Sequence, residues 1–256
     1  MVEKIALVLP AYREGPRIET SLYNVKKGIE MFPDYKFVLY TTDDASPDDT
    51  SKQINKWSTE YGLDTVHHRN SENLGLVETL KQAYGRILEE DYNLILKTDL
   101  DADFDQSEVL RVMVPYAKND AKVVAGIRWR EFTLDENPYE FDRRTEILKI
   151  MERELGLKKM DPPSAGSQLY KNDAIKEILQ QPIVSKYNRK WGLDFLIPIV
   201  AADLGMNVEV VNIEKGNYDP ARRGHQKVKD QYDAYTEIIA ALKGVKPSEI
   251  SKLYGK

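Results

Sequence analysis

Short apolar runs alternate with amphipathic segments along the first half of the chain. The runs predict buried strands at residues 5–10, 37–42, 64–68, 92–98 and 122–127. Between them, apolar side chains recur every three or four residues, which predicts helices at residues 17–31, 50–61, 73–88 and 106–117. Strands that alternate with helices in this way indicate βαβ units with right-handed crossovers. We therefore expect an α/β fold with a mainly parallel, Rossmann-like sheet and helices on both of its faces.

The second half of the chain has a different pattern. Its helical spacing predicts helices at residues 141–155, 172–179, 193–204 and 228–242. Two short apolar runs, at residues 168–170 and 208–213, are typical of strands, and polar loops cover residues 128–138 and 215–224. No internal repeat or low-complexity linker separates the halves. We expect one compact domain over residues 1–256, with halves 1–127 and 128–256.

Four carboxylates follow the strand predicted at residues 92–98. Asp99, Asp101, Asp103 and Asp105 stand at every second position, and strand side chains two apart point the same way. Clustered carboxylates repel one another unless a cation lies among them, and Mg²⁺ and Mn²⁺ favour oxygen ligands. This segment predicts a divalent metal site at the end of a buried strand. On this segment alone, a solvated acidic turn is an equally good interpretation.

Polar clusters at residues 10–14, 43–50 and 99–105 each follow a predicted strand. In parallel sheets, ligands bind beyond the carboxyl ends of the strands. We therefore expect a single ligand to contact all three clusters.

The bulk composition narrows the class of protein. A net charge of -5 argues against nucleic-acid binding through bulk positive charge. The chain has no cysteine and only three histidines, which excludes a histidine-rich metal site. No apolar run approaches the roughly 18 residues that span a bilayer, and the first residues lack a signal-peptide layout. We expect a cytoplasmic protein without a transmembrane segment.

Four motifs occur in order at the predicted strand ends: Pro10-Ala11-Tyr12-Arg13-Glu14, Asp43-Asp44-Ala45-Ser46-Pro47-Asp48-Asp49-Thr50, Asn73-Leu74-Gly75 and Asp101-Ala102-Asp103. Together they resemble the nucleotide-sugar glycosyltransferases of the GT-A fold, especially glycosyltransferase family 2. Each motif is weak alone, and the ordered set is specific. The resemblance implies a nucleotide-sugar-binding half at residues 1–127 and an acceptor-binding half at residues 128–256, ending in a lid loop and a helix.

Two groups within this class share further motifs with the chain. Residues 101–105 and 124–128 are similar to polyprenol-phosphate mannose synthases, and residues 161–166 resemble their Asp-Pro-x-Ser-Gly loop. Trp191-Gly192-Leu193-Asp194 and residues 213–216 instead resemble mannosylglycerate synthase. That enzyme has a histidine as its second metal ligand, whereas the matching place here is near Asp219, with His225 close behind. One of these relatives inverts and the other retains, so the stereochemical outcome stays open.

The resemblance assigns roles in the metal site. Asp103 would be the main ligand of Mg²⁺ or Mn²⁺, and Asp101 would contact ribose or the metal through water. The cation would offset negative charge on the departing nucleoside diphosphate. Asp105, Asp219 and His225 are alternative further ligands, and Asp105 is equally well interpreted as a helix cap.

The remaining roles concern the two substrates. For the nucleotide sugar, the resemblance implies contacts from Pro10, Ala11, Tyr12, Glu14, Asp44, Asn73, Gly75, Ala102, Arg128 and Gly166. Asp44 would recognise base or ribose, with an Asx-turn as the alternative, and Arg128 lies where an anionic acceptor would be held. Asp194 would bind or deprotonate the acceptor hydroxyl, with helix capping as the alternative. Arg222, Arg223, His225 and Lys227 would form a lid over the diphosphate, with a solvated loop as the alternative.

The expected function is metal-dependent transfer of a hexose from a nucleoside diphosphate sugar. The resemblances favour GDP-mannose as donor, with UDP-glucose second, and an acceptor that is either a polyprenyl phosphate at a membrane surface or a small hydroxy acid such as glycerate. A sugar-phosphate nucleotidyltransferase would show a Gly-rich basic loop after the first strand, which residues 10–15 are not. A non-catalytic binding protein would not need Asp103, Asp194 and the basic loop together.

Overall fold

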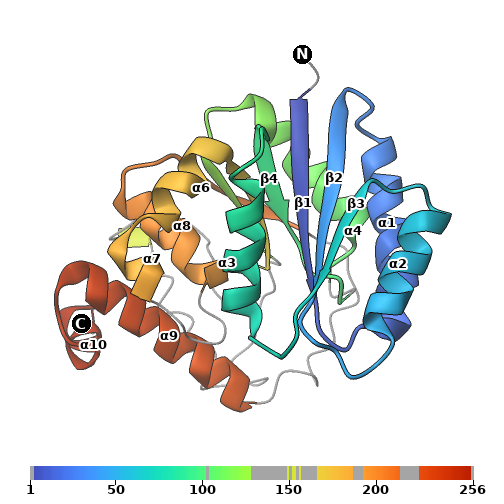
Figure 1. Ribbon diagram of the computed structural model, residues 1–256. Coiled ribbons are helices and arrows are strands. Elements are labelled where there is room, and N and C mark those ends of the chain that lie inside the picture. Colours follow the sequence, from blue (N-terminus) through green and yellow to red (C-terminus); the bar gives the residue numbers. More distant parts are fainter. Residues whose placement is uncertain are drawn as a thin grey trace, which may run out of the picture.

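A seven-stranded sheet forms the centre of the molecule (Figure 1). The structure is a computed structural model that describes residues 3–101, 104–127, 149, 152–153, 156, 166–186, 193–213 and 225–254. The strands are β1 (Glu3–Ala11), β2 (Tyr35–Asp43), β3 (Thr65–Arg69), β4 (Leu94–Lys97), β5 (Val123–Ile127), β6 (Ser167–Lys171) and β7 (Val208–Asn212). Their order is β3-β2-β1-β4-β6-β5-β7. Among these strands only β6 runs antiparallel to its neighbours, so the expectation of a mainly parallel sheet is confirmed.

Helices connect the strands in the alternating way that the spacing predicts. Their bounds are α1 (Ile18–Glu30), α2 (Thr50–Glu60), α3 (Leu76–Ile87), α4 (Gln106–Met113), α6 (Asn172–Leu179), α7 (Pro182–Lys186), α8 (Leu193–Asp203), α9 (His225–Lys243) and α10 (Pro247–Tyr254). Two 3₁₀ helices, η1 (Gly15–Arg17) and η2 (Val114–Lys118), precede α1 and follow α4. Helices α7 and α10 were not predicted, and the helix predicted at residues 141–155 lies largely outside the described residues.

Two boundaries differ from the predictions for identifiable reasons. The third helix begins at Leu76 rather than Asn73, because Gly75 has a left-handed φ of 81° and cannot continue a helical turn. The helix predicted at residues 106–117 changes to a 3₁₀ turn at Val114, and Pro115 follows in its first turn. Proline lacks the N–H that an α-helix needs in its interior.

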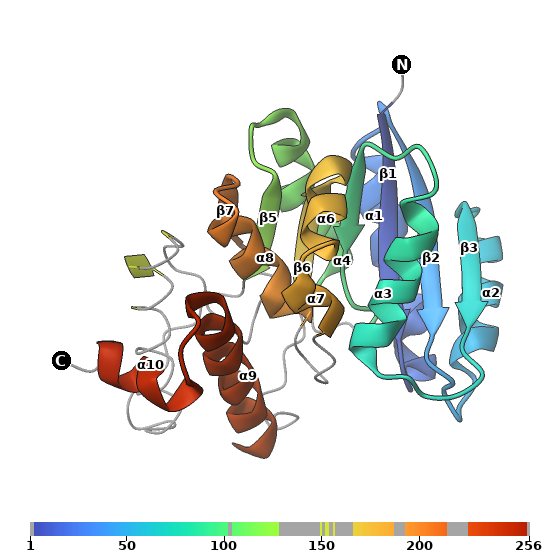
Figure 2. The ribbon, with the colours of Figure 1, turned by 60° about the vertical axis from the view of Figure 1, so that its left-hand side comes forward.

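The two faces of the sheet bury separate apolar clusters, which alternate along β1. Ile5, Leu7 and Leu9 belong to the cluster that α1, α2 and α4 cover, whereas Ala6 and Val8 belong to the cluster that α3, α6 and α8 cover. Figure 2 shows these two helical layers on opposite sides of the sheet. Full burial of a Leu or Ile side chain stabilises the fold by about 1.5–3 kcal/mol. The period-two alternation therefore fixes which side of β1 each helix layer covers.

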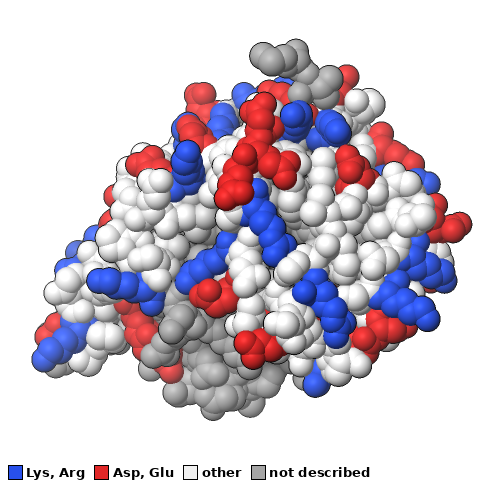
Figure 3. Space-filling view, viewed as in Figure 1, with Lys and Arg blue, Asp and Glu red and all other residues white. Residues whose placement is uncertain are grey.

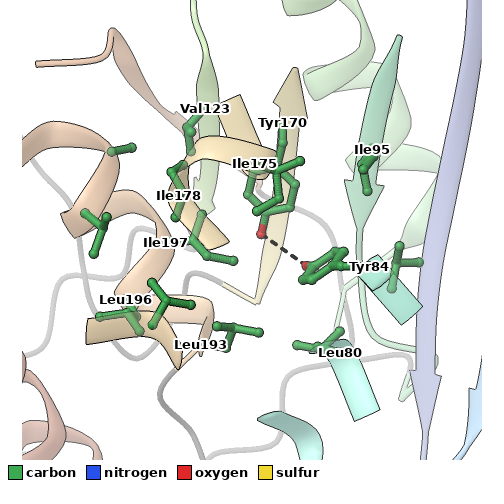
Figure 4. Packing of buried hydrophobic residues seen from close by; sticks show 14 of the residues in the cluster. Leu80, Tyr84, Ile95, Val123, Tyr170, Ile175, Ile178, Leu193, Leu196 and Ile197 are labelled. Atoms are coloured by element: carbon green, nitrogen blue, oxygen red, sulfur yellow. Dashed lines mark hydrogen bonds between the residues drawn. The ribbon is translucent and has the colours of Figure 1, made fainter. Parts of the chain in front are cut away.

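A pair of tyrosines lies within the second of these apolar clusters. Figure 4 shows Tyr84 of α3 and Tyr170 of β6 pointing toward each other, with leucine and isoleucine side chains around them. Their hydroxyl oxygens are 3.5 Å apart and their rings meet edge to face, with centroids 6.0 Å apart. The Tyr170 hydroxyl also donates to Oε1 of Gln168 at 2.5 Å. Polar side chains are thus paired with each other inside an otherwise apolar core.

The surface carries charges of both signs. Figure 3 shows acidic and basic side chains interspersed on the face that includes α3. Within the part of the chain that the structure describes, no helix combines the length and the apolar character needed to cross a membrane.

Candidate functional site

The polar clusters predicted to share a ligand lie together at one edge of the sheet, the lower edge in Figure 1. In the sheet register Ala11 is opposite Asp43, and Val8 is opposite Lys97, so β1, β2 and β4 end close together. The N–H of Asp44 donates to the carbonyl of Ala11 at 3.0 Å and joins the ends of β2 and β1, and Ser21 Oγ of α1 donates to the carbonyl of Leu100, just beyond β4, at 3.1 Å. The three strand ends therefore lie together, and contact of a single ligand with all three clusters stays a prediction.

The loops after β1 and β2 hold two non-glycine residues in the left-handed region. Arg13 has φ 61° and Ala45 has φ 57°, and the N–H of Arg13 donates to Ser46 Oγ at 2.9 Å. Such conformations persist only where surrounding contacts enforce them, and they concentrate at functional sites. The Arg13 guanidinium lies over the Tyr12 ring, 5.1 Å from its centroid, and Tyr12 is 39% exposed. Contact of this exposed ring with the nucleotide stays a prediction.

Glu14, also predicted to contact the nucleotide, is engaged within its own loop. Its Oε2 accepts a hydrogen bond from Arg17 Nη1 at 2.7 Å, and its N–H donates to Thr50 Oγ1 at 3.0 Å. These contacts join η1 to the start of α2. Pro10 and Ala11 are buried residues of β1 itself.

Asp44 is buried and holds the segment before α3. Its Oδ1 accepts from the N–H of Leu74 at 2.9 Å and from Asn70 Nδ2 at 2.7 Å, and its Oδ2 accepts from the N–H of Gly75 at 2.8 Å. Asn73 Nδ2 donates to the carbonyl of Asp44 at 3.3 Å. The structure thus brings Asp44, Asn73 and Gly75 together and gives Asp44 a loop-shaping role. Its direct contact with base or ribose stays a prediction.

The acidic run after β4 divides into residues with different partners. Asp105 caps α4, since its Oδ1 accepts from both the N–H and the Oγ of Ser107, at 2.9 and 2.6 Å. This confirms the capping interpretation of Asp105. Asp101 is half-buried just beyond β4, while Ala102 and Asp103 lie outside the described residues. Within the described ranges, no group of three or more His, Cys, Asp or Glu side chains is arranged to hold a metal ion.

A buried lysine that sequence reasoning missed lies beside this acidic run. Lys97, the last residue of β4, is fully buried, and its Nζ lies 2.9 Å from Asp99 Oδ1, 3.0 Å from Asp194 Oδ2 and 2.9 Å from the carbonyl of Gly166. The contacts tie β4 to the start of β6 and to the first turn of α8. A lysine within an otherwise apolar strand was the available sequence signal, because a buried ammonium requires partners.

The surroundings favour the charged form of Lys97 and disfavour the charged form of Asp194. Burial opposes the charge on Lys97, but the carboxylates of Asp194 and Asp99 outweigh it and raise the pKa of Lys97 above its ordinary value. Burial raises the pKa of Asp194 to about 6; the Lys97 ammonium opposes that rise and the Asp99 carboxylate adds to it. Asp194 Oδ1 is buried without a hydrogen-bond partner among the described residues. A carboxylate that titrates near neutral pH and has an unpaired oxygen fits proton exchange with a hydroxyl group.

The other predicted residues of the second half are less completely described. Gly166 immediately precedes β6, and a Cβ there would lie 3.3 Å from the Phe104 ring and 3.4 Å from Asp99 Oδ2. His225 and Lys227 belong to the first turn of α9, whose backbone alone is described there. Arg128, Asp219, Arg222, Arg223 and Trp191 lie outside the described residues. The structure therefore joins Gly166 and Asp194 to the acidic run.

Comparison with known families agrees with this geometry. Residues 6–179, from β1 to the end of α6, match the domain described as glycosyl transferase family 2. The chain belongs to glycosyl transferase family 2. This glycosyltransferase contains within the matched region all three strand-end loops described above. A comparison with curated protein sequences found no match.

Solved structures similar to this glycosyltransferase include two of glucosyl-3-phosphoglycerate synthase from Mycobacterium tuberculosis. One is in complex with Mn²⁺, UDP-glucose and phosphoglyceric acid; it is 17% identical, with a TM-score of 0.65. The other is in complex with Mn²⁺, UDP and glucosyl-3-phosphoglycerate; it is 16% identical, with a TM-score of 0.63. Each match covers 95% of this chain and 81% of the other. At this identity the similarity establishes the shared fold, which confirms the expected GT-A class.

Proposed function

We propose that this glycosyltransferase moves a hexosyl group from a nucleoside diphosphate sugar to a hydroxyl group of a small acidic acceptor, with a divalent cation. One observation carries the proposal: a similar structure of glucosyl-3-phosphoglycerate synthase, which holds Mn²⁺, UDP-glucose and phosphoglyceric acid together, matches 95% of this chain. The match extends beyond the nucleotide half, so it supports an acceptor of the same chemical class. Residues 1–127 would bind the nucleotide and residues 128–256 the acceptor.

The proposed donor is UDP-glucose rather than GDP-mannose. GDP-mannose was the first expectation from the sequence, and none of the similar structures reported above holds it, whereas UDP-glucose is named in one of them. The exposed Tyr12 ring would stack on the base, and the Asn73–Gly75 segment, held by Asp44, would flank it. Both donors carry the same diphosphate, so the groups that contact the base and the hexose would decide between them.

The residues present fit a divalent cation by their chemistry. Asp101 and Asp103 offer carboxylate oxygens at the end of β4, and hard cations such as Mg²⁺ and Mn²⁺ prefer such ligands. Because Asp105 Oδ1 is engaged as a helix cap, we favour Asp219 or His225 over Asp105 as the further ligand. When bound, the cation offsets negative charge on the departing diphosphate.

The acceptor would be held by groups from the second half. Asp194, with its unpaired Oδ1 and a pKa of about 6, would accept the proton of the attacking hydroxyl. Arg128 would bind the acidic group of the acceptor, and Arg222, Arg223 and Lys227 would close over the diphosphate. A cytoplasmic location, and hexosyl transfer to a lipid phosphate at a membrane surface, remain predictions from the sequence.

Thermal unfolding with nucleotides tests the metal site. We expect UDP to raise the unfolding temperature only when Mn²⁺ is present, because ligands stabilise the native state by RT ln(1 + [L]/Kd), about 2.7 kcal/mol at a hundredfold excess over Kd. Asp103→Asn should abolish the shift. The matched control is Asp91→Asn, which removes an exposed carboxylate before β4, at the opposite edge of the sheet. A metal-dependent shift with GDP instead of UDP would favour GDP-mannose over UDP-glucose as the donor. No shift with either nucleotide would contradict the proposal.

A further inference from the structure

Two separate anchors hold Asp194. The first acts on its carboxylate: the buried Lys97 ammonium uses its three N–H groups on Asp194, Asp99 and the Gly166 carbonyl, all within 3.0 Å. A lysine ammonium has three donors, so none is left for a substrate. Lys97 is therefore not placed to bind a ligand itself; its contacts fix Oδ2 of Asp194, whose Oδ1 has no hydrogen-bond partner within the described part of the chain.

The second anchor acts on the backbone of Asp194. In an α-helix, its carbonyl would accept the N–H of the residue four positions later, which is Pro198 inside α8. Proline has no N–H, so the helix leaves this carbonyl without its usual donor. Gln168 of β6 supplies one, because its Nε2 donates to the Asp194 carbonyl.

The amide of Gln168 is itself oriented by the core. Its Oε1 accepts the Tyr170 hydroxyl at 2.5 Å, and the Tyr84 hydroxyl lies 3.5 Å from that of Tyr170. Figure 4 shows these two tyrosines, from α3 and β6, meeting in the apolar cluster that also contains Leu193 at the start of α8. The oriented amide can present only its NH₂ group to the Asp194 carbonyl.

We propose that Lys97 and Gln168 are positioning residues, which together hold Asp194 so that its unpaired carboxylate oxygen faces the acceptor hydroxyl. The inference rests on the proposed function, in which Asp194 acts on that hydroxyl. Fold stability alone gives a poor reason for such a cluster, since well-packed apolar residues often replace a buried ion pair without loss. The cluster also lies at the strand ends where the substrate loops meet, rather than in the middle of the sheet.

The pH dependence of turnover separates positioning from mere structural support. The titratable groups that face Asp194 among the described residues are Lys97 and Asp99 of the β4 segment, Tyr84 of α3 and Tyr170 of β6. Asp194 must be ionised to accept a proton, so kcat should rise with pH through about 6. Loss of the ammonium removes the one positive charge in this set and makes ionisation of Asp194 harder.

The first experiment measures kcat and KM against pH for hexosyl transfer from UDP-glucose to 3-phosphoglycerate with Mn²⁺, with GDP-mannose as second donor. For Lys97→Met we expect the midpoint of the rising limb to move above about pH 7, with a loss on the order of tenfold at pH 6 and little change in donor KM. The control is Lys122→Met, which removes a lysine paired with Asp173 at the surface. A lower rate with an unmoved midpoint would overturn the role of Lys97.

A second experiment tests the hydrogen bond from Gln168 to the Asp194 carbonyl, and it does not depend on whether Lys97→Met folds. Gln168→Met should lower kcat about tenfold in the native background, where Gln168 Nε2 donates to the Asp194 carbonyl and Pro198 cannot. In Pro198→Ala the helix regains an N–H at position 198, so Gln168→Met should then cost less than about threefold. Equal losses in both backgrounds would overturn the role of Gln168.

The outcomes also distinguish this inference from the proposed function. Suppose that the wild-type protein transfers hexose, that the pH midpoint of Lys97→Met is unmoved, and that Gln168→Met costs as much in Pro198→Ala as in the native background. Only the positioning inference is then wrong. If the wild-type protein transfers no hexose and binds no nucleotide with Mn²⁺, the proposed function falls and takes the inference with it.

Discussion

The Oδ2 atom of Asp44 accepts the backbone N–H of Gly75 at 2.8 Å and so joins the end of β2 to the start of α3. Asp44 is 5% exposed, and its other oxygen accepts two further hydrogen bonds. The residue therefore shapes the loop that flanks the proposed nucleotide site.

Asp44→Asn tests this loop-shaping role. The amide replaces one acceptor oxygen with an NH₂ group that would face an N–H donor, so we expect a loss of about 1–3 kcal/mol in the free energy of unfolding. Donor KM should rise as the loop shifts. Urea unfolding and steady-state kinetics measure the two effects, and an unchanged stability would contradict the role assigned to the carboxylate.

The backbone conformation at position 75 favours glycine, whereas the space around it would admit a larger residue. Its φ is 81°, and a Cβ there would meet nothing within 4 Å, so Gly75→Ala should cost about 1–3 kcal/mol of unfolding free energy from conformational strain alone. The matched control is Gly85→Ala in the interior of α3, which also has open space around a Cβ but no left-handed φ. That change should stabilise the protein by about 0.5–1 kcal/mol. Similar effects at both positions would refute the strain argument.

Stability should fall in mild acid because of His67. Burial lowers the pKa of His67, although the nearby Asp43 carboxylate opposes this, and its ring nitrogens contact Thr41 Oγ1 and Ser51 Oγ. The unfolded chain takes up the proton more readily than the native state. The contribution of His67 to the free energy of unfolding should therefore decrease as pH falls below about 6.5, its ordinary pKa, whereas Asp194, with its raised pKa, acts in the opposite direction.

Urea midpoints at pH 5 and pH 8 measure this effect. His67→Gln should reduce the difference between them and leave a smaller part due to His68, whose pKa burial also lowers. If His67→Gln kept the full wild-type difference in urea midpoint between pH 5 and pH 8, His67 would not be its cause.

Much of the fold follows from local pattern. All seven strands coincide with predicted apolar runs, including the short ones at residues 168–170 and 208–213. The antiparallel direction of β6 was not predictable, because its short run has the same local pattern in either direction. Helix α7 was missed because its five residues carry too little periodicity, and α10 was not predicted.

The site was predictable where motifs are local and not where partners are distant. The strand-end loops were located from residues close together in sequence. Lys97 was read as part of an apolar strand, since its partner Asp194 is 97 positions away. The link between Pro198 and Gln168 was equally hidden. It depends on the Asp194 carbonyl, whose usual helical donor Pro198 cannot supply, and on a hydrogen bond from Gln168 that only the structure shows.

The most direct test of the account is hexosyl transfer itself. Purified protein would be incubated with UDP-glucose or GDP-mannose, Mn²⁺ and 3-phosphoglycerate, and the glycosylated acid measured by mass spectrometry, with glycerate and a polyprenyl phosphate as alternative acceptors. We predict product from UDP-glucose and 3-phosphoglycerate, and none after metal chelation. Asp103→Asn should lower the rate of transfer at least about a hundredfold, as loss of a group that stabilises transition-state charge typically does. Absence of product from every donor and acceptor pair, in protein that binds UDP with Mn²⁺, would contradict the proposed transfer.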